Sequence, residues 1–131
     1  MIVVDTSALV AIAFGEPECD AFRKAIQRSD RALVSTVSIV EARVVVHSRK
    51  GQRAVVWLDD LLRMPPFEVV APGIDEAQAA YAAFVAFGRG SGHAAGLNLG
   101  DLFSYALAKV RGLPLLYKGK DFALTDIASA A

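Results

Sequence analysis

The sequence has 131 residues, of which 54% are hydrophobic and 21% are charged, and its 14 basic residues balance 14 acidic ones. This composition indicates one globular domain, here residues 1–131, and excludes a disordered chain. The only cysteine, Cys19, excludes an intramolecular disulfide and a multi-cysteine metal site. No apolar run approaches the roughly 20 residues of a membrane span. We therefore expect a cytoplasmic protein.

The first half of the chain alternates short apolar runs with helical patterns. Two strands are expected, at Ile2–Val4 and Ala32–Val34, because β-branched and aliphatic residues follow one another there without a polar break. Three helices are expected, at Ala8–Phe14, at Cys19–Arg28 and from Ser35 or Thr36 to about Lys50.

The second half of the chain repeats this alternation. Helices are expected at Arg53–Arg63, at Asp75–Phe87 and from Asn98 to about Arg111, with a glycine-rich loop over Gly88–Gly100. Strands are expected at Phe67–Val70 and Leu115–Tyr117. Strands that alternate with helices predict an α/β fold with a mostly parallel sheet flanked by helices, and ligands of such sheets gather beyond the carboxyl ends of the strands.

Four carboxylates stand where charge is unexpected. Asp5 directly follows the first strand, and Glu41 lies in an otherwise apolar part of a helix. Asp101 opens the last long helix, and Asp121 follows the last strand. We expect Asp5, Asp101 and Asp121 to meet at one edge of the sheet. Carboxylates in a cluster do not stay ionised unless a positive charge neutralises them, and Mg²⁺ is a suitable partner because it prefers oxygen ligands.

Each of these acids also has a purely structural interpretation, which for Glu41 is an ion pair with a buried arginine. Asp5 can cap the helix that follows it, and Asp121 alone is an ordinary turn residue. Asn98 and Asp101 have the spacing of a helix cap followed by an acid at the third helical position, which the helix dipole favours. The spacing of the acids by itself leaves both interpretations open.

Four motifs, in order along nearly the whole chain, resemble those of PIN domains. Val3–Leu9 (VVDTSAL) is similar to their opening motif, in which an acid ends the first strand and a Ser/Thr pair follows. Ser35–Glu41 (STVSIVE) resembles their second acidic motif. Gly96–Ala108 (GLNLGDLFSYALA) resembles the third motif in the form found in VapC toxins, and Leu115–Phe122 (LLYKGKDF) with Thr125–Ile127 (TDI) resembles the VapC C-terminal segment.

The resemblance implies a PIN-like three-layer fold and a Mg²⁺- or Mn²⁺-dependent endoribonuclease, the toxin of a type II toxin–antitoxin pair. It implies that Asp5 and Asp101 bind the metal and that Glu41 and Asp121 complete the catalytic acidic pocket. It further implies an RNA substrate and a VapB-type antitoxin. A homodimer or a larger toxin–antitoxin complex is also expected, since zero net charge gives little protection against self-association.

The C-terminal motif departs from the common PIN pattern. Many PIN domains place the fourth acid two residues after a Thr at the end of the last strand, whereas those positions hold Tyr117 and Gly119 here. The acid comes later, at Asp121, and Asp126 is a second candidate for its role.

Four further residues are candidates for contacting the substrate. Thr6 and Ser7 can hold a ligand water or a phosphate, and Asn98 lies beside Asp101. Arg89 lies in the glycine-rich loop, where a guanidinium and backbone N–H groups can follow a phosphate backbone.

Two other functions compete with the nuclease. The first is a non-catalytic PIN-like module that regulates through an antitoxin, against which the presence of all four acids argues. The second is a phosphatase with an aspartyl nucleophile at Asp5, which usually needs another acid two residues later, where this chain has Ser7.

Overall fold

The computed structural model describes residues 1–131 and contains one four-stranded sheet. The strands are β1 (Ile2–Val4), β2 (Ala32–Ser35), β3 (Phe67–Val70) and β4 (Leu115–Leu116), in the spatial order β3-β2-β1-β4. Each neighbouring pair is parallel, and Val3 of β1 is in register with Leu33 of β2 and Leu115 of β4. The expected α/β fold is confirmed, with a sheet that is wholly parallel.

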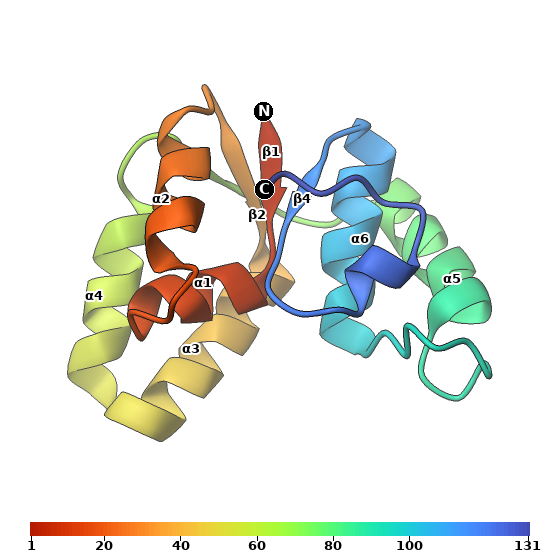
Figure 1. Cartoon of the computed structure of the whole chain (residues 1–131), viewed down its shortest axis with the longest axis horizontal. Coiled ribbons are helices and arrows are strands. Elements are labelled where there is room, and N and C mark those ends of the chain that lie inside the picture. Colours follow the sequence, from red (N-terminus) through yellow and green to blue (C-terminus); the bar gives the residue numbers. More distant parts are fainter.

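Helices cover both faces of the sheet (Figure 1). One face is covered by α1 (Thr6–Ala13), α2 (Cys19–Gln27), α3 (Thr36–Lys50) and α4 (Gln52–Leu62). The other face is covered by α5 (Ile74–Phe87) and α6 (Leu99–Arg111). None of these helices combines the length and apolar character needed to cross a membrane.

Alternation along the central strands divides the core into two layers. Val4 and Val34 belong to the apolar cluster shared with α1 to α4, whereas Val3 and Leu33 belong to the cluster shared with α5 and α6. Successive strand residues point to opposite faces of a sheet, so a strand covered on both sides must be apolar throughout. This explains the uninterrupted Ile2–Val4 run and produces the three-layer architecture.

Most element boundaries lie within two residues of their predicted positions. Helix α1 begins at Thr6 instead of Ala8, because the Asp5 side chain accepts a hydrogen bond from Ser7 N and caps the helix. Strand β4 ends at Leu116, one residue early. Two C-terminal features were not predicted: the short 3₁₀ helix η1 (Phe122–Leu124), and a final segment in which Ser129 pairs with Leu115 of β4.

The topology gathers several chain segments at the carboxyl edge of the sheet. The chain crosses over the first face from β1 to β2 and from β2 to β3, and over the opposite face from β3 to β4. The crossover direction therefore changes between the adjacent strands β1 and β4, the kind of position at which open α/β sheets bind ligands. The starts of α1, α3 and α6 lie at this edge (Figure 1), and Asp5 is the residue that precedes α1.

Candidate active site

Asp5 lies at the centre of this edge and is almost completely buried, with 2% of its surface exposed. Its Oδ2 accepts hydrogen bonds from Ser7 N at 2.9 Å and from Ser7 Oγ at 2.6 Å. Its Oδ1 is buried and has no hydrogen-bond partner. A buried carboxylate oxygen without a partner is costly, so the fold leaves this atom with an unmet need for a positive or donor group.

Glu41 projects from α3 toward the same edge. Thr6 Oγ1 donates a hydrogen bond to Glu41 Oε1 at 3.0 Å. Burial raises the pKa of the Glu41 carboxyl, and the negative charge of Asp5 raises it further, although the hydrogen bond from Thr6 opposes both effects. The carboxylate lies so close to Gly100 that a Cβ at this position would overlap it.

Asp101 caps helix α6 and also belongs to the acidic group. Its N–H donates to Asn98 Oδ1 at 2.9 Å, and its Oδ2 accepts from Asn98 N at 3.0 Å, which forms a capping box at the start of α6. Burial raises the pKa of Asp101 to about 6, and the charges of Asp5, Glu41 and Asp121 add to this effect. The structural and functional interpretations of this acid are therefore compatible.

Asp121 completes the group from the segment between β4 and η1. Its side chain is exposed and makes no cap hydrogen bond to η1, but its charge acts on Asp101. The structure thus places Asp5, Glu41 and Asp121 within electrostatic reach of Asp101, and Asp5 within reach of Glu41.

Asp126 has different partners. Tyr105 donates its hydroxyl to Asp126 Oδ1, and Lys109 Nζ lies 2.8 Å from Asp126 Oδ2. Both partners are on α6, and together with Asp126 they hold the C-terminal segment against that helix. Asp126 is not among the charges that act on Asp101. Its contacts give it a structural role.

The residues predicted to touch substrate lie in two different settings. Thr6, Ser7 and Asn98 donate to, or accept from, the acids and so orient them. Arg89 is exposed and forms no ion pair, in the loop between α5 and α6 at the same end of the molecule as the start of α6 (Figure 1).

The acidic edge fits a hydrated cation better than a closed metal cage. No group of three His, Cys, Asp or Glu side chains is arranged so that it could hold a metal ion by itself. Mg²⁺, however, is usually bound through one or two carboxylates and keeps several of its waters. The unpartnered Asp5 Oδ1 and the Asp101 carboxylate are suitable ligands of this kind.

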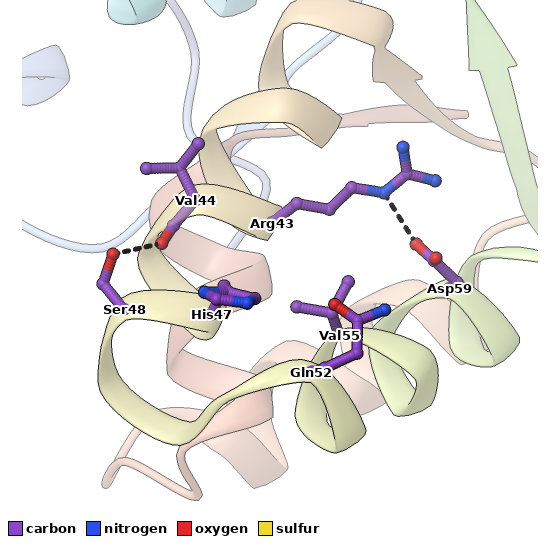
Figure 2. Close-up of a pocket in the computed structure, with 7 residues that line it drawn as sticks. All are labelled: Arg43, Val44, His47, Ser48, Gln52, Val55 and Asp59. Carbon is purple, nitrogen blue, oxygen red and sulfur yellow. Dashed lines mark hydrogen bonds and ion pairs between the residues drawn. The ribbon is translucent and has the colours of Figure 1, made fainter.

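The largest hollow of the surface, about 550 Å³, lies elsewhere, between α3 and α4. Figure 2 shows its lining, in which Arg43 donates from Nε to Asp59 at 2.9 Å and His47 lies on the α3 side. It contains no residue of the acidic group.

Comparison with known proteins agrees with the fold. A family model described as PIN domain matches residues 2–128. Ribonuclease VapC30 of Mycobacterium tuberculosis is 45% identical over 130 residues, which cover 99% of this chain and 98% of the relative. Ribonuclease VapC of Mycolicibacterium smegmatis is 45% identical over 128 residues, which cover 98% of each protein.

Solved structures show the same fold at lower identity. Mycobacterium tuberculosis VapC20, described as a sarcin–ricin loop cleaving toxin, superposes with a TM-score of 0.80 at 19% identity, covering 98% of this chain and 97% of that one. A chain of a toxin–antitoxin complex from Klebsiella pneumoniae superposes with a TM-score of 0.68 at 21% identity, covering 94% and 91%.

The stability of the metal-free protein should depend on pH through Asp101. Because its pKa is raised from 3.8 to about 6, the folded protein holds this proton more tightly than the unfolded chain does. Proton binding by Asp101 therefore stabilises the folded protein most below pH 4, and this stabilisation is lost as the pH rises through about 6. Urea unfolding in EDTA at several pH values should show this fall in wild type and less of it in Asp101→Asn. Identical pH profiles for the two proteins would contradict the prediction.

Gly100→Ala should displace Glu41 without unfolding the protein. The new methyl group meets the flexible end of Glu41, which can move away, while Ala favours a helix by up to about 1 kcal/mol. We expect the free energy of unfolding to change by no more than about 1 kcal/mol and the pKa of Asp101 to fall, as NMR titration would show. In a Glu41→Ala background the same substitution should leave that pKa unchanged. A loss of roughly 3 kcal/mol or an unchanged pKa in the otherwise wild-type protein would contradict this.

Proposed function

The chain belongs to the PIN domain family and to its VapC branch, and from this premise we propose that it is a Mg²⁺- or Mn²⁺-dependent endoribonuclease, the toxin of a type II toxin–antitoxin pair. The observation that carries the proposal is the buried Asp5 Oδ1, which has no hydrogen-bond partner although the charge of Asp5 acts on both Glu41 and Asp101. An arrangement that only stabilised the fold would supply a donor for that atom.

Asp5 and Asp101 are the residues we propose as metal ligands. Asp5 is held rigidly through Oδ2, so its Oδ1 has a fixed direction, and Asp101 is fixed by its capping box. A bound divalent cation would stabilise the charge that develops on a phosphodiester during hydrolysis. Asp121, which is exposed, would complete the acidic pocket from the solvent side.

Glu41 is placed to handle a proton. Thr6 fixes Oε1 and leaves Oε2 free of hydrogen bonds, and the raised pKa brings the carboxyl nearer to the working pH. A general base works best when its pKa lies near that pH. We therefore propose that Glu41 Oε2 accepts a proton from the attacking water.

RNA cleavage should require the cation and the two ligand acids. We expect Asp5→Asn and Asp101→Asn each to reduce the cleavage rate at least about 100-fold, since even partners outside the coordination shell contribute 10–100-fold. Asp126→Asn, a matched carboxyl-to-amide change outside the acidic group, should leave the rate within about threefold of wild type. The measurement is cleavage of a structured RNA in Mg²⁺ and in EDTA, together with growth during expression, which wild type should slow. Full activity in EDTA would refute the proposed mechanism.

Exposed apolar side chains support a protein partner and a homodimer. Tyr81, Phe84 and Val85 form one exposed face of α5, and Leu99, 71% exposed, lies across an apolar groove between α5 and α6. Contiguous apolar surface of this kind marks protein interfaces. We propose self-association through this surface and an antitoxin that places an Arg or Lys in the acidic pocket, because a guanidinium matches carboxylates bidentately.

The molar mass in solution tests the homodimer, and inhibition of RNA cleavage tests the antitoxin. Light scattering of the purified chain should give twice the 13.9 kDa of one chain, and Tyr81→Ser combined with Phe84→Ser should halve it.

The product of a short reading frame next to the gene should inhibit RNA cleavage, and Ala in place of its inserted basic residue should weaken inhibition at least about tenfold. A monomeric wild type, or inhibition that is independent of every basic residue of the partner, would contradict the respective proposal.

A further inference from the structure

Lys118 connects parts of the chain that are distant in sequence. It lies in the segment Tyr117–Asp121, which leaves β4 and leads to η1. Its Nζ is 2.7 Å from Glu16 Oε2 and 3.2 Å from Glu18 Oε2, both in the turn between α1 and α2. The side chain therefore ties the exit of β4 to the far end of α1.

The backbone of the same residue reaches Asp5 through one intermediate. Lys118 N donates to Ser7 Oγ at 3.0 Å, and Ser7 Oγ donates in turn to Asp5 Oδ2 at 2.6 Å. Because the hydroxyl has one proton, accepting from Lys118 N favours the rotamer that gives this proton to Asp5. Three residues after Lys118 the segment supplies Asp121, so a shift of Lys118 would alter two members of the acidic group.

The ammonium of Lys118 is committed to the two glutamates. The hydrogen bond that Lys118 donates to Glu16 and its salt bridge with Glu18 raise the pKa of Lys118. The pKa of Glu18 is lowered by its backbone hydrogen bond and by Lys118. One positive and two negative charges leave this trio with a net charge of −1, which would not attract an RNA phosphate. Lys120, two residues later, is exposed and forms no ion pair.

We infer that Lys118 is a positioning residue of the acidic site. Its salt bridges to Glu16 and Glu18 fix the segment after β4, which holds the Ser7 hydroxyl on Asp5 Oδ2 and so keeps the Asp5 carboxylate, with its free Oδ1, in one orientation. The inference rests on the proposed function in one respect: the pocket is taken to bind Mg²⁺.

The test compares three substitutions in the full chain. Lys118→Met removes the ammonium but keeps the aliphatic stem and the backbone N–H. Lys118→Arg restores a positive charge that can reach the glutamates. Lys120→Met is the matched control, because it removes the same charge from the same segment without breaking a salt bridge.

Two measurements are made on each protein. The first is the Mg²⁺ concentration that gives half-maximal RNA cleavage, which should rise about tenfold or more in Lys118→Met, the range found for partners outside the coordination shell. It should stay within about twofold of wild type in Lys118→Arg and Lys120→Met. The second is hydrogen exchange of the Ser7 and Lys118 amides in the metal-free protein, which should become at least about tenfold faster in Lys118→Met alone.

The outcomes separate positioning from other roles. A lower melting temperature in Lys118→Met with an unchanged Mg²⁺ midpoint and unchanged amide exchange would overturn the inference in favour of a fold-stabilising bridge. Equal losses of cleavage in Lys118→Met and Lys120→Met would overturn it in favour of general attraction of RNA. If Lys118→Met does not fold, Glu16→Gln combined with Glu18→Gln removes the partners instead, and the same shifts are expected. Absence of Mg²⁺-dependent cleavage in wild type would refute the proposed function, whereas the exchange rates would still decide whether Lys118 holds Ser7 and Asp5 in place.

Discussion

A carboxylate at the end of a strand that is buried on both faces has little access to water, and Asp5 is in this position. The fold supplies two donors to Oδ2, both from Ser7, and none to Oδ1. The negative charge of Asp5 adds to the burial that raises the pKa of Glu41 and of Asp101, and Glu41 and Asp121 act on Asp101 as well. The hydrogen bonds at the carboxyl edge of the sheet hold Asp5, Glu41 and Asp101 together despite their like charge.

The acids are held by hydrogen bonds that also have structural functions. Ser7 is held on Asp5 at the start of α1, and Asn98 and Asp101 cap α6 reciprocally. In Asp5 and in Asp101 these bonds fix Oδ2 and leave Oδ1 without a hydrogen bond. Because these residues lie at the starts of α1 and α6, the two helices hold the acids in place. The arrangement has a cost at Gly100, because glycine has a low helix propensity but a larger residue there would overlap the Glu41 carboxylate.

Local patterns predicted the elements and the edge at which the acids lie. The β-branched Ile2–Val4 run and the Asn98 cap have short-range signatures, and the rule for parallel sheets places the strand ends together. Contacts between distant residues had no such signature. Lys118 and Glu16 are 102 residues apart, and Tyr105 and Asp126 are 21 apart, and nothing in the neighbourhood of either pair indicates its partner. The same holds for the pairing of Ser129 with β4 and for the space that Glu41 needs at Gly100.

Partners, rather than position in the sequence, distinguish the acids of this chain. Asp126 resembled a member of the acidic group because it follows the last strand, yet both of its oxygens have a donor from α6. Glu76 is as buried as many core residues, but it accepts a hydrogen bond from Gly73 N at the start of α5. Glu16 and Glu18 share Lys118. Asp5 differs from all of these, because it is the most buried acid of the chain and its buried Oδ1 has neither a hydrogen-bond donor nor a salt-bridge partner. Folding stability alone would favour an N–H or O–H donor for that oxygen, and the bound cation that we propose would supply the positive charge that it lacks.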